Sequence, residues 1–275
     1  MDEITADYSV EQLLPPVELK VRVDVRVAAK TDLGRVRENN EDKFEFFIPS
    51  DDGTLARKGQ VFVVCDGMGG HAAGQIASEL ATKTFIDVYL NHPSEDPTAA
   101  MQGAVGAANR YVNNVSIAVP SRRGMGTTLS ALVLLQGQGY IAQVGDSRVY
   151  RVRDGQVEQL TVDHTWVEEA VRSGLITREE GENHPYQHVI TRAIGTSADV
   201  VPDIIPCDIA AGDTYVLCSD GLTNHVSDGE LLGLVQANGP SEAAWKLVAA
   251  ALQDGGSDNT TVLVVRIDAI DSLGS

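Results

Sequence analysis

Four apolar runs in the sequence have an aspartate at or beside one end, and together these aspartates could build a metal site. The four residues are Asp66, Asp146, Asp220 and Asp258. Neighbouring strands of a sheet end near one another, so the four carboxylates could converge at one edge, where they would repel each other strongly. Divalent cations between them would offset that repulsion, and carboxylates without histidine or thiolate partners favour Mg²⁺ or Mn²⁺ over Zn²⁺. A single aspartate at a strand end is better explained as a turn former, so the metal-site prediction depends on the set.

The stretch around Asp66 has the clearest local pattern. Residues 61–65 are continuously apolar, which indicates a strand buried on both faces, and this strand ends at Asp66. Three glycines follow within four positions, and a helical pattern begins near His71. A carboxylate at the tip of a buried strand, followed by backbone that can adopt unusual angles, suits a metal or phosphate site. An ordinary strand-to-helix turn is the alternative for this stretch taken alone.

Two further segments fit a phosphate site. Arg37 lies in a polar loop shortly before residues 40–42, and arginine can bind phosphate through two parallel hydrogen bonds. Residues 124–128 (GMGTT) open the strand series, and the small residues among them would permit close approach of the backbone. For Arg37 alone, a surface salt bridge with Glu38 or Glu41 is the simpler interpretation.

The elements that must position these residues follow from hydrophobic periodicity. Valines alternate with polar residues from Val21 to Val27, which is typical of a half-exposed antiparallel strand. Further strands are predicted at residues 43–48, 61–65, 127–135, 140–144, 147–152, 156–160, 213–218 and 260–267. Helices are predicted at about residues 71–90, 97–117, 228–236 and 241–252. Residues 51–53 are interpreted as a turn, and Gly103 and Gly106 weaken the second helix prediction.

Residues 163–199, between the predicted strands at 156–160 and 213–218, contain no predicted strand. Asp163 is expected to be the N-cap of a helix that carries Trp166 and Val171. Residues 172–199 are polar and irregular, a pattern that often forms a flap. In the last predicted helix, Trp245, Val248 and Leu252 are expected to share one face.

Strand runs without strict helix alternation favour antiparallel sheets covered by helices, an α+β fold in one domain. Residues 1–20 are rich in acids and contain little that could form a core, so we expect a mobile acidic extension before a domain over residues 21–268. An autoinhibitory or docking tail is the alternative for this extension.

Composition excludes several classes of function. The 275 residues are 43% hydrophobic, and 39 acids against 21 bases give a formal net charge of −18. Such a charge should repel DNA and anionic membranes, whereas cations in a site could still attract an anionic substrate. The three cysteines lie in apolar runs and are expected to be buried thiols in a reducing compartment. No signal segment or membrane-spanning run is present, so we expect a cytoplasmic protein.

Seven short blocks in a fixed order resemble one known family, the metal-dependent protein phosphatases of the 2C type (PPM family), and most of all its bacterial serine/threonine branch. The blocks are residues 37–42 (RENNED), 66–71 (DGMGGH), 126–128 (GTT), 145–148 (GDSR), 191–195 (TRAIG), 219–222 (SDGL) and 256–261 (GSDNTT). The resemblance covers about residues 22–267. Single blocks are weak signals, but seven in order are highly specific. The implied fold is a four-layer αββα sandwich of two antiparallel sheets flanked by helices.

The resemblance also implies roles for individual residues. Asp66 would bridge two metal ions, the Gly67 carbonyl would bind the second ion, and Asp220 and Asp258 would complete the first. Asp42, with Glu41, would hold metal-bound water, and Asp146 with Asp220 would hold a third and weaker ion. Arg37 would bind the substrate phosphate. Residues 163–197 match the flap, which influences substrate choice.

The implied activity is hydrolysis of phosphoserine and phosphothreonine in proteins, with Mn²⁺ or Mg²⁺ as cofactor and a metal-bridging hydroxide as nucleophile. The hydroxide would attack phosphorus in line while the metals and Arg37 neutralise the equatorial oxygens. The partners would be phosphorylated targets of a serine/threonine kinase. One departure concerns the general acid, because animal members have histidine where this chain has Met68. Leaving-group protonation must then come from metal-bound water or another group.

Three alternatives remain at this point. The enzyme could serve one dedicated regulator, such as an anti-sigma-factor antagonist, and the flap would decide that. A catalytically dead relative would be expected to lose metal acids, and Asp66, Asp220 and Asp258 are all present. A metal-storing or structural domain leaves Arg37 unexplained. The sequence does not identify the substrate, the kinase, the metal used in the cell or the oligomeric state.

Overall fold

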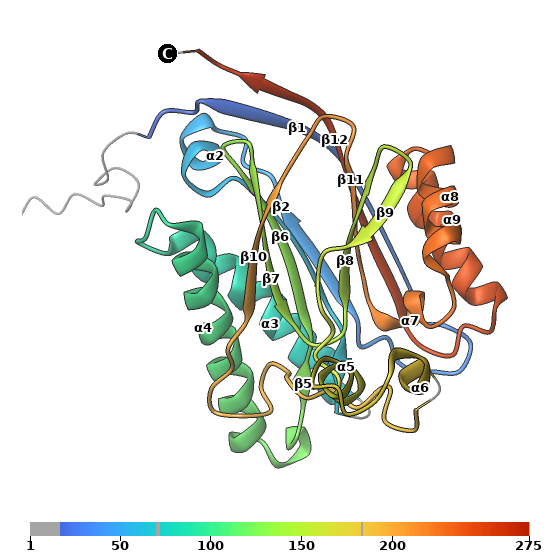
Figure 1. Ribbon diagram of the computed structural model, residues 1–275. Helices are drawn as coiled ribbons and strands as arrows, with labels where there is room; N and C mark the ends of the chain where they lie inside the picture. The colour runs from blue at the N-terminus through green and yellow to red at the C-terminus, as the bar shows by residue number, and fades with distance from the viewer. Residues whose placement is uncertain (1–16, 70–71, 183, 275) are drawn as a thin grey trace, which may run out of the picture.

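Two five-stranded antiparallel sheets pack face to face in the computed structural model, which describes residues 17–69, 72–182 and 184–274 (Figure 1). The first sheet has the order β1 (Val21–Asp32), β12 (Thr260–Ser272), β11 (Thr214–Cys218), β8 (Arg148–Arg153) and β9 (Gln156–Gln159). The second has the order β10 (Asp203–Asp208), β7 (Gln138–Val144), β6 (Leu129–Leu135), β3 (Gln60–Cys65) and β2 (Lys43–Phe47). A short ribbon pairs β4 (Gly67–Met68) with β5 (Gly126–Thr127).

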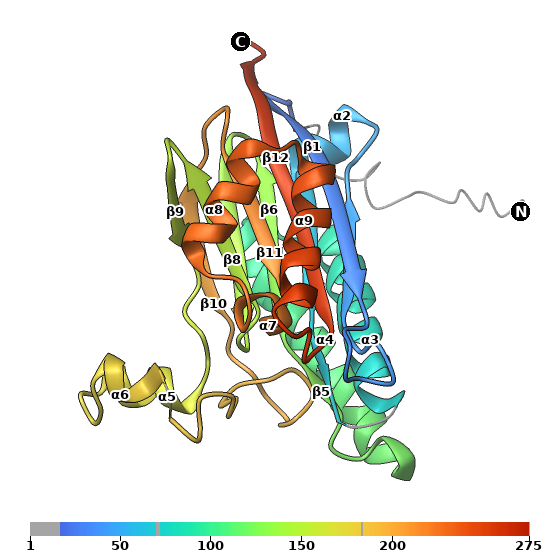
Figure 2. The same ribbon diagram turned by 90° about the vertical axis from the view of Figure 1, so that its right-hand side faces the viewer.

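Helices cover the outer face of each sheet, which confirms the predicted four-layer αββα sandwich (Figures 1 and 2). Over the second sheet lie α3 (Ala72–Asn91) and α4 (Pro97–Ala118), and over the first lie α8 (Asp228–Ala237) and α9 (Pro240–Gln253). The short helices are α2 (Asp52–Lys58), η1 (Pro120–Arg122), α5 (Trp166–Arg172), α6 (Arg178–Glu182) and α7 (Asp220–Thr223). Among the described residues, no helix is both long enough and apolar enough to cross a bilayer.

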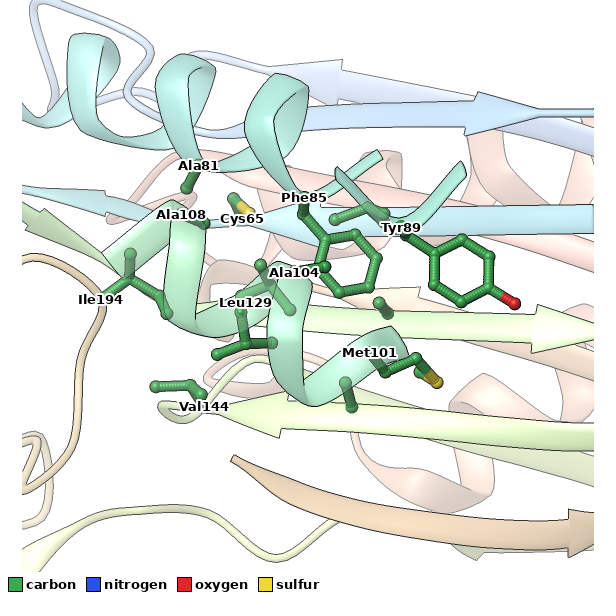
Figure 3. Packing of buried hydrophobic residues seen from close by; sticks show 14 of the residues in the cluster. Cys65, Ala81, Phe85, Tyr89, Met101, Ala104, Ala108, Leu129, Val144 and Ile194 are labelled. Atoms are coloured by element: carbon green, nitrogen blue, oxygen red, sulfur yellow. The ribbon is translucent and has the colours of Figure 1, made fainter. Parts of the chain in front are cut away.

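Each interface between layers has its own hydrophobic core. Side chains from the inner faces, such as Phe62 and Tyr215, fill the space between the two sheets. Phe85 of α3 and Met101 of α4 pack on the second sheet around Leu129, as Figure 3 shows. A third core lies beneath α8 and α9. The strands that carry the candidate aspartates are therefore held on both faces, which fixes where their ends lie.

The structure contains elements that the sequence patterns did not predict. Residues 51–53 do not form a simple turn, because Asp51 caps α2 by accepting a hydrogen bond from Thr54 N at 2.8 Å. Strand β10 was not predicted, since it is an edge strand with Pro206 at its centre and little alternation. The irregular stretch 172–199 contains α6. The predicted strand 127–135 is divided between β5 and β6 at Thr128.

Three residues have different surroundings from those predicted. Thr165, not Asp163, caps α5, because Asp163 is already paired with Arg148 through Nη2 at 2.7 Å. Trp245 is 64% exposed with the Lys30 ammonium over its ring, so it does not belong to the buried face of α9. Helix α4 runs through Gly103, where a Cβ atom would lie only 2.7 Å from His92 Nε2.

Two predictions fall partly outside the described residues. Most of the acidic extension, residues 1–16, and the helix start at His71 lie there. Within the described part, Leu19 is buried against Leu55 and Ala56. The division at residues 20 and 21 stays a prediction. Figure 2 shows α5 and α6 projecting from one end of the sandwich, at the position predicted for the flap.

Candidate metal centre

A cleft of about 660 Å³ lies at one end of the sandwich and gathers most of the predicted site residues. Those in its lining are Arg37, Asp66, Gly67, Asp146, Asp220 and Asp258. The topology explains the convergence. Strands β3 and β7 both pair antiparallel with β6, so they run parallel to each other, and Asp66 and Asp146 follow their ends at the same edge. The end of β11 pairs with the start of β12, which brings Asp220 beside Asp258.

Hydrogen bonds to its backbone hold Asp66 in place. Its N–H donates to Thr128 Oγ1 at 2.8 Å, and its carbonyl accepts from Thr128 N and Thr127 Oγ1, both at 2.8 Å. The carboxyl is left to face the cleft. Burial raises its pKa well above the usual value, and repulsion from Asp42, Asp220, Asp146 and Asp258 raises it further.

Gly67, the first residue of β4, lies at a point where the backbone is crowded. A Cβ atom there would lie 2.2 Å from the Gly74 carbonyl oxygen and 2.6 Å from that of Glu41. Only glycine fits this approach, so the residue type is set by packing. The same close packing holds the peptide that carries the predicted carbonyl ligand beside Asp66.

Asp220 follows β11 and Asp258 precedes β12, and these two strands are neighbours in the sheet. Asp220 is the first residue of α7, and its Oδ2 accepts from Asn224 Nδ2 at 3.2 Å. Its Oδ1 is buried and has no hydrogen-bond partner among the described residues. Burial, followed by repulsion from Asp258, raises the Asp220 pKa. Asp258 Oδ1 accepts from Asn259 N at 2.8 Å, which orients its carboxyl at the start of β12.

Asp146 lies on the loop between β7 and β8 and is 7% exposed. Burial is the main cause that raises its pKa to about 7, and repulsion from Asp220 adds to this. A buried network supports the loop. Gln143 Nε2 donates to the carbonyls of Gly145 at 3.0 Å and Ser147 at 2.7 Å, one on each side of Asp146.

Asp42 lies behind the cleft wall instead of in the lining. It is 2% exposed, and its Oδ2 accepts from Ser219 Oγ at 2.7 Å, directly before Asp220. Its Oδ1 is buried without a hydrogen-bond partner among the described residues. Burial is the main cause that raises the Asp42 pKa to about 7. Of the two acids predicted to act together, Glu41 lines the cleft and Asp42 supports it from behind.

Arg37 is paired with a distant acid rather than with either nearby glutamate considered from the sequence. Its Nη2 donates to Asp258 Oδ2 at 2.6 Å, across 221 positions of the chain. The guanidinium is 56% exposed and borders the cleft. Asn259 holds the loop that carries it, because its Nδ2 donates to the carbonyls of Leu33 and Asn39 at 2.9 and 3.0 Å. Arg37 and Asp258, the predicted phosphate-binding residue and a predicted metal ligand, are therefore in direct contact.

The chemistry of this donor set fits hard divalent cations. All of the donor atoms are oxygens, which hard divalent cations prefer. Four of the carboxyls have raised pKa values, and two buried carboxyl oxygens lack hydrogen-bond partners in the described part of the chain. In residues 17–69, 72–182 and 184–274, no three acidic, histidine or cysteine side chains already form a closed ligand group. A bound cation would have to draw the carboxylates together, and it would relieve the repulsion that raises their pKa values.

Several cleft residues were not identified from the sequence. His188 and Ile190 reach the cleft from the flap, and Asn224 and Ser257 border it beside Asp220 and Asp258. A polar residue next to a predicted ligand could have identified Ser257, and a polar residue four positions after one could have identified Asn224. No local pattern marks His188, because the fold of the flap brings it there.

Comparison with known proteins gives one consistent family. The family model for "Protein phosphatase 2C" matches residues 37–257. The serine/threonine protein phosphatase PstP of Mycobacterium tuberculosis is 38% identical over 248 residues, which is 90% of this chain but 46% of PstP. The chain thus spans about half the length of this relative. The serine/threonine phosphatase stp of Listeria innocua is 36% identical over 86% of this chain and 94% of its own length.

Solved structures agree with this comparison. The catalytic domain of PstP in complex with two manganese ions superposes with a TM-score of 0.77 at 37% identity, covering 90% of this chain and all of that one. That structure shows that a similar fold holds two manganese ions.

Proposed function

Since this chain belongs to the protein phosphatase 2C family, we propose that it is a metal-dependent protein phosphatase that hydrolyses phosphoserine and phosphothreonine. The observation that carries this proposal is the cleft itself. It combines mutually repelling carboxylates, which suit divalent cations, with the Arg37 guanidinium, which suits phosphate. The manganese-bound relative supports Mn²⁺ as the cofactor, with Mg²⁺ as the other candidate.

Asp66, Asp220, Asp258 and the Gly67 carbonyl would hold two cations, and Asp146 with Asp220 would hold a third. When bound, these ions supply positive charge in the cleft and favour the ionisation of water that attacks phosphorus. Asp42 acts from behind, because its bond to Ser219 holds the residue that precedes Asp220.

Arg37 stabilises the charge on the equatorial phosphate oxygens during the displacement. Its guanidinium must then turn from Asp258 towards the phosphate, and 56% exposure leaves room for that movement. Met68 borders the cleft but carries no transferable proton, so it does not protonate the leaving oxygen.

The physiological substrates are proposed to be targets of a serine/threonine kinase. The flap reaches the cleft through His188 and Ile190, so it would contact the residues around the phosphorylated side chain. A reducing compartment such as the cytoplasm suits three buried thiols, Cys65, Cys207 and Cys218.

The test is hydrolysis of a phosphothreonine peptide by the full chain, with Mn²⁺ or Mg²⁺ added. Asp66→Asn removes the charge at the centre of the cleft and should lower kcat by about 10³-fold, since a metal supplies several kcal/mol of transition-state stabilisation. Chelator should remove the activity of the wild type, and His92→Gln, away from the cleft, is the control. Phosphate release that persists in Asp66→Asn, or that ignores chelator, would contradict the proposal.

A further inference from the structure

One hydrogen-bonded chain beside the cleft has no part in the function proposed above. His225 Nδ1 lies 3.0 Å from Asp254 Oδ2, and its Nε2 lies 2.8 Å from Ser257 Oγ. The backbone N–H of Ser257 also donates to Nε2, at 3.1 Å. The imidazole is only 11% exposed, whereas Asp254 is 66% exposed. Of the three residues, Ser257 lines the cleft, and His225 follows α7, whose first residue Asp220 also lines it.

The donors around His225 define its tautomer. The Ser257 N–H points at Nε2, so this nitrogen is an acceptor and Nδ1 carries the hydrogen that is donated to Asp254. The ring therefore fastens two points of the loop at once. The hydrogen bond to Asp254 fixes the orientation of the ring. A carboxylate that is not itself a metal ligand often orients a histidine side chain in this way.

The loop needs this fastening because of its glycines. Gly255 and Gly256 have φ values of +134° and +54°, which favour glycine and leave the free backbone with many alternatives. Ser257 and Asp258 follow them directly. Without an anchor, the position of the Asp258 carboxylate would depend on a flexible pair of glycines.

His225 is also tied to the other carboxylate. It follows α7, its backbone N–H donates to the Leu222 carbonyl at 3.1 Å, and α7 begins at Asp220. Asn224, its neighbour, donates to the Asp220 carboxyl. Two connections therefore link Asp220 to Asp258. One is the pairing of β11 with β12, and the other is the hydrogen bonding of His225 to Ser257.

We propose that His225 is a positioning residue that sets the separation of Asp220 and Asp258 and thereby the affinity of the cleft for divalent cations. This inference rests on the proposed function only in assigning both carboxylates to metal. A residue that positions a ligand typically changes metal affinity 10- to 100-fold when it is lost. His225 touches neither cation nor substrate, so its effect should appear in cation binding first.

The test measures Mn²⁺ binding to the full chain by isothermal titration calorimetry. His225→Phe keeps the ring but removes both nitrogens, and it should weaken Mn²⁺ binding about 10- to 100-fold. His225→Gln can still accept from the Ser257 N–H and should lose less. Ser257→Ala removes one of the two bonds to Nε2 and should weaken binding roughly 2- to 10-fold, the equivalent of one net hydrogen bond. His92→Phe is the matched control.

A second measurement separates positioning from general stability. Thermal melting curves of the metal-free variants should show that His225→Phe still folds. Saturating Mn²⁺ should restore most of its phosphatase activity. Mn²⁺ affinity unchanged in His225→Phe, or lowered equally in His92→Phe, would overturn the inference. If His225→Phe does not fold, Asp254→Ala decides, because it removes the acceptor of Nδ1, retains the ring and lies outside the cleft lining; unchanged Mn²⁺ affinity in Asp254→Ala would then overturn the inference. Wild type that binds no Mn²⁺ would instead count against the proposed function.

Discussion

The charge of Asp42 should destabilise the metal-free protein as the pH rises, and Asp42→Asn should remove that effect. Asp42 is 2% exposed and its pKa is raised to about 7, chiefly by burial. A carboxyl whose folded pKa lies above the unfolded value holds its proton more tightly when folded. Its contribution to stability is then complete below the unfolded pKa of 3.8 and is lost as the pH rises through the folded value of about 7.

The magnitude follows from the width of this interval. Between pH 5 and the folded pKa of about 7 there are roughly two pH units, and each corresponds to about 1.4 kcal/mol. The wild type should therefore lose about 3 kcal/mol between pH 5 and pH 8 from this residue alone. The charge of Asp42 also raises the pKa of Asp66. Asp42→Asn should therefore lower the Asp66 pKa and reduce the loss of stability that Asp66 causes as the pH rises. Burial lowers the pKa of His164, so the contribution of this residue to stability increases as the pH rises. This opposes the loss of stability from Asp42 by the same amount in wild type and variant.

The assay is urea unfolding in chelator at pH 5, 6, 7 and 8, with the free energy of unfolding compared between wild type and Asp42→Asn. At pH 5 the variant should be less stable, by about 1–3 kcal/mol, because an amide would replace the partnerless Oδ1. Its stability relative to wild type should then improve steadily towards pH 8. Saturating Mn²⁺ should flatten the wild-type curve, because cations neutralise the cluster. Parallel pH curves for the two proteins would refute the reasoning.

Three other outcomes are expected. Arg37→Ala should lower kcat/KM for a phosphopeptide by about 10- to 100-fold, from the loss of a charge-assisted hydrogen bond, and Arg37→Lys should restore only part of it; equal rates for all three proteins would exclude a phosphate contact. Gly67→Ala places a Cβ atom 2.2 Å from the Gly74 carbonyl, so urea unfolding should show a loss of about 1–3 kcal/mol or more, and unchanged stability would be inconsistent with this packing. Burial raises the pKa of Cys65 and Cys218 to about 12, so mass spectrometry should find both unmodified after iodoacetamide treatment of the native protein at pH 8, and alkylated only in urea.

Local patterns in the sequence predicted most of the fold. The continuous apolar run at residues 61–65 became β3, fully buried, and the helical period at residues 228–236 became α8. These predictions succeed because side-chain periodicity follows directly from helix and strand geometry. Strand β10 escaped because an edge strand interrupted by proline has no such periodicity. The N-cap of α5 was misassigned because several residues before the helix could accept the capping bond, and tertiary pairing had already used Asp163.

The sequence by itself determined which acids could meet, because Asp66, Asp146, Asp220 and Asp258 stand beside apolar runs that have to be buried strands. Tertiary structure alone decided what each of them touches. Strand order placed all four carboxylates at one cleft, and it brought Arg37 to Asp258 across 221 positions, rather than to a nearby glutamate. The reason is physical, since periodicity along the chain reports which face is buried, whereas pairing between distant strands depends on how whole layers pack.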